Sequence, residues 1–115
     1  MLHSGEVLEQ HGWEMIRPMG CPRWSSVVGV MAGRLYVCGG GDGESVLCSA
    51  ERYDPSTNSW EELPLMSSAR WDATALVADC LYLLGGSDES GPSSTVERFE
   101  PSSGAWSSVP QVWLA

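Results

Sequence analysis

Part of this sequence occurs twice. When the segment Val27–Trp60 is shifted by 46 positions, it aligns with Ala73–Trp106 without a gap. The matched positions are Leu35-Tyr36 with Leu81-Tyr82, Gly39-Gly40 with Gly85-Gly86, Asp42 with Asp88, Glu51-Arg52 with Glu97-Arg98, Tyr53 with Phe99, Pro55 with Pro101, and Trp60 with Trp106. A repeat at this spacing predicts a fold made of stacked copies of one supersecondary unit.

A second alignment, at a spacing of 47 residues, extends the similarity toward the N-terminus. It places Trp13 on Trp60, Met19 on Met66, Arg23 on Arg70, and Trp24 on Trp71. We therefore expect residues 1–12 to be a flexible N-terminal extension, 13–26 the last strand of a partial unit with a connecting loop, 27–63 the first full repeat, 64–110 the second, and 111–115 a divergent tail.

Each repeat predicts four short strands. In the first copy we expect them at Val27–Met31, Leu35–Cys38, Ser49–Tyr53 and around Trp60–Leu63. Turn residues separate these segments at short intervals, which is typical of an antiparallel meander. Because no segment shows an apolar period of 3.6 residues, we expect an all-β chain without helices.

The turns carry specific conformational predictions. Asn58 of the first copy is replaced by Gly104 in the second, and these two residue types adopt positive φ most readily. We therefore expect positive φ at both positions. The diglycine after the second strand predicts a point where two backbones approach too closely for a Cβ atom.

The charge of the chain excludes several classes of function. Fifteen acidic residues against six basic ones give a formal net charge of −9. This balance excludes nucleic-acid binding and attraction to an anionic membrane. The chain has neither an apolar run of spanning length nor a recognisable secretory signal. Four cysteines without a CxxC pair predict free thiols in a reducing compartment, so we expect a cytoplasmic or nuclear protein.

The repeated segment resembles the kelch repeat. In that repeat a diglycine is followed about 13 residues later by an aromatic residue and then by tryptophan. The sequence is most similar to the BTB–kelch (kelch-like) proteins, through Arg17-Pro18-Met19 with Arg23, Leu35–Gly40, and Glu51–Trp60. The resemblance covers residues 13–110, and no BTB or BACK segment is included in it.

This resemblance implies the fold. Kelch repeats form the four-stranded antiparallel blades of a β-propeller, so we expect kelch-type blades here. The aromatic residues Tyr36, Tyr82, Trp60 and Trp106 are then expected to pack between blades. The residues of the structural motif are Gly39, Gly40, Tyr53, Trp60, Gly85, Gly86, Phe99 and Trp106.

The number of repeats predicts an incomplete propeller. A ring needs at least about four blades, and this sequence supplies about two. We favour a fragment or a short splice form of a longer kelch protein. Two alternatives remain: copies of the chain complete a ring through their unpaired blade faces, or the two blades stay open.

The candidate binding residues lie in loops at one end of the blades. In a meander, the loop between the second and third strands shares an end with the segment that joins one blade to the next. The tentative partner-binding residues are Arg23, Trp24, Arg70, Trp71, Asp42 and Asp88. Each has a structural alternative: the arginines bond loop carbonyls, the tryptophans pack in the core, and the aspartates are solvated charges. Glu51 and Glu97 are expected in local ion pairs or as a charged strand edge.

The resemblance implies a non-catalytic protein–protein interaction module, similar to the propellers with which BTB–kelch adaptors bring substrates to cullin ubiquitin ligases. The main alternative is an actin-associated or scaffolding kelch protein. Galactose oxidase, which has kelch-like repeats, makes a copper oxidase a further alternative. However, His3 and His11 both precede the repeats, so a copper centre or a Ser–His nucleophile cannot be assembled within them. We expect no enzyme activity, no cofactor and no metal site.

Overall fold

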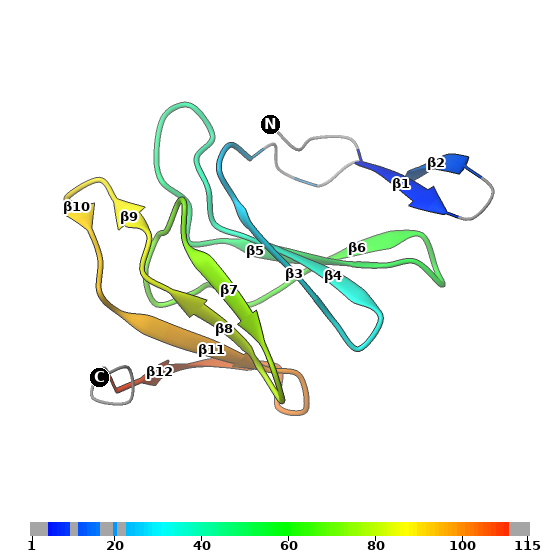
Figure 1. Ribbon diagram of the computed structural model, residues 1–115. Helices are drawn as coiled ribbons and strands as arrows, with labels where there is room; N and C mark the ends of the chain where they lie inside the picture. The colour runs from blue at the N-terminus through cyan, green and yellow to red at the C-terminus, as the bar shows by residue number, and fades with distance from the viewer. Residues whose placement is uncertain (1–4, 10–11, 17–19, 21–22, 111–115) are drawn as a thin grey trace.

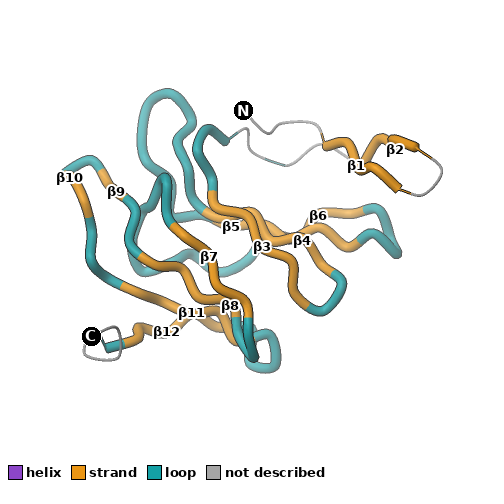
Figure 2. Tube along the Cα trace, in the orientation of Figure 1, coloured by secondary structure: helices purple, strands orange, loops and turns teal. Residues whose placement is uncertain are grey.

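The computed structural model describes residues 5–9, 12–16, 20 and 23–110. Within these residues it contains strands and turns and no helix, which confirms the all-β prediction. Figure 1 and Figure 2 show two four-stranded sheets side by side, with loops gathered at one end of both. This arrangement confirms the prediction of two four-stranded antiparallel blades, which do not close into a ring.

The first sheet is an antiparallel meander. Its strands pair in chain order, and each lies within two residues of its predicted position. They are β3 (Val27–Met31), β4 (Arg34–Cys38), β5 (Ala50–Asp54) and β6 (Ser59–Glu62).

The second sheet repeats this topology. Its strands are β7 (Thr74–Val77), β8 (Leu81–Leu84), β11 (Val96–Glu100) and β12 (Ala105–Val109). Its long loop contains a small hairpin that the sequence pattern did not indicate, formed by β9 (Ser87–Asp88) and β10 (Gly91–Pro92). Asn58 and Gly104 have φ values of 50° and 68°, which confirms the predicted positive φ at both turns.

A separate hairpin precedes the first sheet. It consists of β1 (Gly5–Glu9) and β2 (Gly12–Ile16), and Leu8 pairs with Trp13. The register matches those of the later hairpins, where Trp60 and Trp106 pair with an aromatic residue of the preceding strand. Strand β1 thus lies within the N-terminal extension that was expected for residues 1–12. Leu8 and Trp13 are five positions apart in the sequence, whereas the paired Tyr53 and Trp60 of the β5–β6 hairpin are seven apart. No single sequence shift therefore aligns both β1 and β2 with the strands of the repeats.

The first two strands of the two sheets differ in register by one residue. Val28 pairs with Val37 in the first sheet. The corresponding residues of the second sheet are Thr74 and Leu83, but Thr74 pairs with Leu84 instead. A slip of one residue reverses which side chains face each side of a sheet. Strand β7 therefore presents the opposite set of side chains to that of β3.

The turn residues account for this slip. Ala32 and Gly33 form a two-residue turn with positive φ at both positions, as a tight hairpin requires. In the second repeat Asp79 replaces this glycine, and three residues separate β7 from β8. Val77 of β7 consequently lies toward Gly29 of β3, at the boundary between the sheets.

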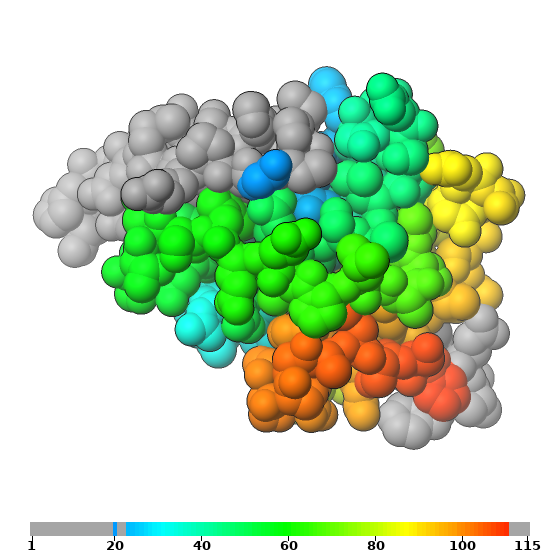
Figure 3. Space-filling view, turned by 180° about the vertical axis from the view of Figure 1, so that it is seen from behind, coloured from blue at the N-terminus to red at the C-terminus, as the bar shows by residue number. Residues whose placement is uncertain are grey.

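The core lies between the two sheets. Tyr36 of β4 and Phe99 of β11 are buried, with ring centroids 5.8 Å apart, and Phe99 also contacts Trp106 at 5.2 Å. Trp106 donates a hydrogen bond of 2.8 Å from its indole N–H to the carbonyl of Pro64. Figure 3 shows the segment that follows β6, in green, lying against β12, in orange. Tyr36 and Trp106 thus pack between blades as predicted, while Tyr82 on the other face is half-buried.

The buried thiol of Cys38 gives a testable prediction. Burial raises its pKa to about 12, against a smaller opposing effect of Arg23. Since the thiolate is the reactive form, we expect iodoacetamide at about pH 8 to spare Cys38 in the folded chain and to modify it in urea. Peptide mass spectrometry measures both sites, with the half-buried Cys48 as the internal control. Equal modification of the two cysteines in the folded chain would contradict this burial.

Candidate functional site

One arginine anchors the start of each sheet. In the first repeat, Arg23 donates hydrogen bonds of 2.9 Å to the carbonyls of Gly39 and Ser49, and its Nη2 lies 3.2 Å from Glu51 Oε2. These contacts join the segment before β3 to the loop after β4 and to strand β5. The arginine therefore fastens three parts of the chain that are distant in sequence.

The second repeat contains the same arrangement with one further bond. Arg70 donates to the carbonyls of Gly85 and Thr95 at 2.8 and 2.9 Å. Both its Nε and its Nη2 lie 2.9 Å from Glu97 Oε2. By contrast, Nε of Arg23 finds no hydrogen-bond partner among the described residues. The pair in the second repeat is thus the more completely bonded of the two.

Each glutamate also holds the backbone of the connecting segment. Glu51 Oε1 accepts the N–H of Gly20 at 2.8 Å, and Glu97 Oε1 accepts the N–H of Ser67 at 2.9 Å. Both glutamates are buried. The expectation of local ion pairs or a charged strand edge is therefore wrong for both glutamates. Their arginine partners, Arg23 and Arg70, lie 28 and 27 residues earlier in the chain.

The burial of Arg23 and Arg70 decides between their two interpretations. Each is 1% exposed and is bonded to internal acceptors. The structural alternative, in which the arginine bonds loop carbonyls, describes what the structure shows. Neither guanidinium is positioned to meet a carboxylate of a partner, because a buried charge already paired with glutamate offers no accessible donor face.

The diglycine lies where the arginine-bearing segment crosses the sheet. Gly39 has φ 65°, and a Cβ atom at this position would overlap the carbonyl oxygen of Arg70. The adjacent Gly40 donates its N–H to that same oxygen at 2.6 Å. In the second repeat a Cβ atom on Gly86 would lie 2.7 Å from the carbonyl oxygen of Trp71. The predicted close approach of two backbones is confirmed at these positions.

The tryptophan that follows each arginine points outward. Trp24 is 53% exposed and Trp71 is 41% exposed, so the expectation that they pack in the core is wrong. Each is fixed by a pair of backbone hydrogen bonds, between Trp24 and Gly41 at 2.8 Å and between Trp71 and Ser87 at 2.9 Å. In an extended segment successive side chains point in opposite directions, so burying the arginine exposes the indole.

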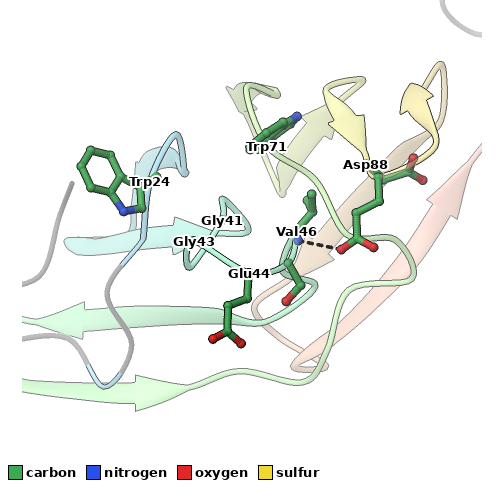
Figure 4. Close-up of a pocket in the computed structure, with 9 residues that line it drawn as sticks. Trp24, Gly41, Gly43, Glu44, Val46, Trp71 and Asp88 are labelled. Carbon is green, nitrogen blue, oxygen red and sulfur yellow. Dashed lines mark hydrogen bonds between the residues drawn. The ribbon is translucent and has the colours of Figure 1, made fainter.

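The two indoles line one open pocket of about 580 Å³ at the loop end. Figure 4 shows Trp24 on one side and Trp71 on the other, with the loop of Gly41 and Val46 between them. Glu89, from the loop of the second sheet, accepts the N–H of Val46 at 2.9 Å. The pocket is therefore built by both sheets. The residues that line it are Trp24, Gly41, Gly43, Glu44, Ser45, Val46, Trp71, Asp88 and Glu89.

The charged residues that line the pocket are acidic. They are Glu44, Asp88 and Glu89. Asp88, a predicted site residue, lies in the lining. Asp42 is not in the lining, and its Oδ1 accepts the backbone N–H groups of Glu44 and Ser45 at 2.9 Å. The hydrogen bond from the backbone of Ser45 has the largest effect on the pKa of Asp42. Together with a smaller effect of the bond from Glu44, it holds this pKa below its usual range.

Sequence reasoning did not find Glu44 or Glu89 as parts of this site. Their only signal was the acidic character of the two long loops. Within the described part of the chain, no group of three or more His, Cys, Asp or Glu residues is placed to hold a metal ion. His3 and His11 lie outside the described residues. No helix in that part of the chain is long and apolar enough to cross a membrane.

Comparison with known proteins agrees with the repeat and the fold. The model of the Kelch motif matches residues 22–67 and 73–112. The solved structure of YjhT superposes with a TM-score of 0.75 at 22% identity, over 84% of this chain and 40% of that one. At this identity the likeness shows the fold alone.

Curated relatives are similar over part of this chain. An F-box/kelch-repeat protein of Arabidopsis thaliana is 43% identical over 75 residues, which are 60% of this chain and 16% of that protein. Human Kelch-like protein 35 is 36% identical over 70 residues, which are 61% of this chain and 12% of that protein. Human Kelch-like protein 4 is 39% identical over 54 residues, covering 46% and 8%. The chain thus corresponds to a small part of each relative.

Proposed function

Because this chain belongs to the kelch-repeat family, we propose that it is a non-catalytic protein-interaction module that binds partners through the loop end of its blades. The observation that carries this proposal is the pocket between Trp24 and Trp71. A fold normally buries tryptophan, yet here both repeats expose one at the same structural position. Tryptophan is enriched among the residues that dominate binding energy.

The geometry of the two tryptophans suits binding. Their backbones are fixed by paired hydrogen bonds to the loops behind them, so little backbone ordering remains to be done when a partner binds. The pocket is open and concave, and its walls come from two blades. A rigid aromatic surface of this kind is typical of recognition sites rather than of a packed core.

The adaptor role is a finer proposal. We propose that the chain is the kelch segment of a larger BTB–kelch-like protein, which presents bound substrates to a cullin ubiquitin ligase in the cytoplasm or nucleus. Its similarity to Kelch-like proteins 35 and 4, and the small share of those proteins that it covers, support this proposal. Val30 and Leu76, which are exposed on the blades, would then be covered by further blades of a longer form or by a second copy.

The proposed binding surface can be tested by paired variants. We expect the double variant Trp24→Ser/Trp71→Ser to lose partners captured by the wild-type chain from a cell extract. Each indole is expected to contribute about tenfold or more in affinity, since hot-spot tryptophans contribute about 2 kcal/mol. The control is Leu65→Ser, which removes an apolar side chain that is 63% exposed and does not line the pocket. Retention of every partner by the double variant would refute the proposed surface.

A further inference from the structure

The charges around the pocket have one sign and are not neutralised locally. The chain contains no lysine, and five of its six arginines lie among the described residues. Arg23 and Arg70 are buried against glutamates, and none of the five described arginines lines the pocket. Arg34 and Arg52 form ion pairs with Asp54 and Glu61 on the strands. Among the residues that the structure describes, the acidic groups of the pocket thus have no basic side chain beside them in its lining.

We propose that this pocket binds an arginine or lysine side chain from an extended basic segment of a partner protein. The inference rests on the proposed function and adds the chemistry of the partner. Indole faces attract cations through their quadrupole, and tryptophan does so more strongly than other aromatic residues. Glu44 and Asp88, from the long loops of the two sheets, add carboxylates to the same lining, and carboxylates form strong hydrogen bonds with cationic side chains. One pocket thus combines the two kinds of group that recognise a cationic side chain.

The negative charge of the site excludes an acidic partner segment. An acidic segment would need an accessible arginine at the loop end, and the fold buries both arginines of the connecting segments. It would also meet three carboxylates and a chain of net charge −9. Like charges brought together in a partly desolvated interface oppose binding. The site therefore discriminates by charge in favour of a basic partner.

The shape of the pocket accommodates an extended backbone. Gly41 and Gly43 form part of its wall, and a Cβ atom on Gly43 would meet nothing within 4 Å. At Gly43 the missing side chain leaves room for the partner's main chain. The bond from Val46 N–H to Glu89 holds the two loops in register across the opening. A cationic side chain can then lie against an indole face while its backbone lies along the loops.

Matched synthetic peptides test the inference on the full 115-residue chain. We would measure fluorescence anisotropy with three labelled peptides of the same Gly/Ser backbone, carrying arginine, its neutral isostere citrulline, or glutamate. We expect the arginine peptide to bind about tenfold or more tightly than the citrulline peptide. The glutamate peptide is expected not to bind, and salt should weaken the arginine complex.

Charge-neutral variants locate the binding. We expect Glu44→Gln and Asp88→Asn each to weaken the arginine peptide severalfold. Glu62→Gln removes the same charge from an exposed position of β6 and should leave the affinity unchanged. Circular dichroism would verify that the variants remain folded. Equal weakening by Glu62→Gln, or equal affinity for arginine and citrulline peptides, would overturn the inference.

The two proposals fail in different ways. If the arginine peptide does not bind but the double tryptophan variant still loses its captured partners, the binding surface stands and the basic partner is rejected. If the peptide binds but the captured partners are retained by the tryptophan variant, the proposed function at this surface is rejected.

Discussion

Replacing Glu97 with alanine is expected to lower the free energy of unfolding of this chain by about 3–5 kcal/mol. The substitution leaves the buried guanidinium of Arg70 without its carboxylate and removes the acceptor of the Ser67 N–H. An unpaired charge in a buried position is costly, because the charge was taken out of water only in exchange for its partner. Urea denaturation followed by tryptophan fluorescence measures the change.

The control for this result is an exposed ion pair in the first sheet. Arg52 Nε lies 2.6 Å from Glu61 Oε1, but Glu61 is 61% exposed at its side chain. Solvent screening reduces such pairs to about 1 kcal/mol or less, so Glu61→Ala should shift the unfolding midpoint little. The loss of unfolding free energy in Glu97→Gln should lie between the losses in Glu97→Ala and Glu61→Ala. The glutamine keeps a hydrogen-bond acceptor for Arg70 but leaves its charge unpaired. If Glu97→Ala and Glu61→Ala had the same effect, the buried pair would not stabilise the blade.

Gly39→Ala should destabilise the chain by about 2–5 kcal/mol. The positive φ of Gly39 costs any L-residue about 1–2 kcal/mol. In addition, the new Cβ atom would displace the Arg70 carbonyl and break its bond with the Gly40 N–H. Leaving buried backbone groups without partners adds about 1–3 kcal/mol. The unfolding midpoint in urea is again the measurement.

Gly104 separates the effect of backbone conformation from that of close contact. It has φ 68°, but a Cβ atom there would meet nothing within 4 Å. Gly104→Ala should therefore cost only the conformational contribution of about 1–2 kcal/mol. Gly104→Asn should be nearly neutral, because Asn58 occupies the same turn of the first repeat at φ 50°. Should Gly39→Ala cost no more than Gly104→Ala, the close approach at the diglycine would be disproved.

The sequence predicted the features that depend on neighbouring residues. The alternation of short apolar segments with turn residues indicated the strands, and the exchange of Asn58 for Gly104 indicated a left-handed turn residue. The first hairpin escaped this reasoning because its shortened turn breaks the spacing on which repeat detection depends. The register slip in the second sheet was also missed, since replacing Gly33 by Asp79 changes the turn without changing the number of residues between the aligned positions.

The candidate site was predicted in location but not in the roles of its residues. The meander topology correctly places the arginine–tryptophan segments at the same end as the long loops. Arginine is usually exposed and tryptophan usually buried, yet at this site those tendencies are reversed in both repeats. The arginine is buried because a glutamate and loop carbonyls from distant segments satisfy its donors, and these partners cannot be identified from local sequence.

The kelch blades of this chain could be inferred from local sequence, because strand length, turn chemistry and the spacing of the repeat are properties of short segments. The tertiary structure alone decided which side of each connecting segment faces the solvent. That choice depends on a buried ion pair between residues 27 or 28 positions apart. It turns Trp24 and Trp71 outward and leaves an acidic, aromatic pocket at the loop end, because the burial of each arginine forces its neighbour to the opposite side.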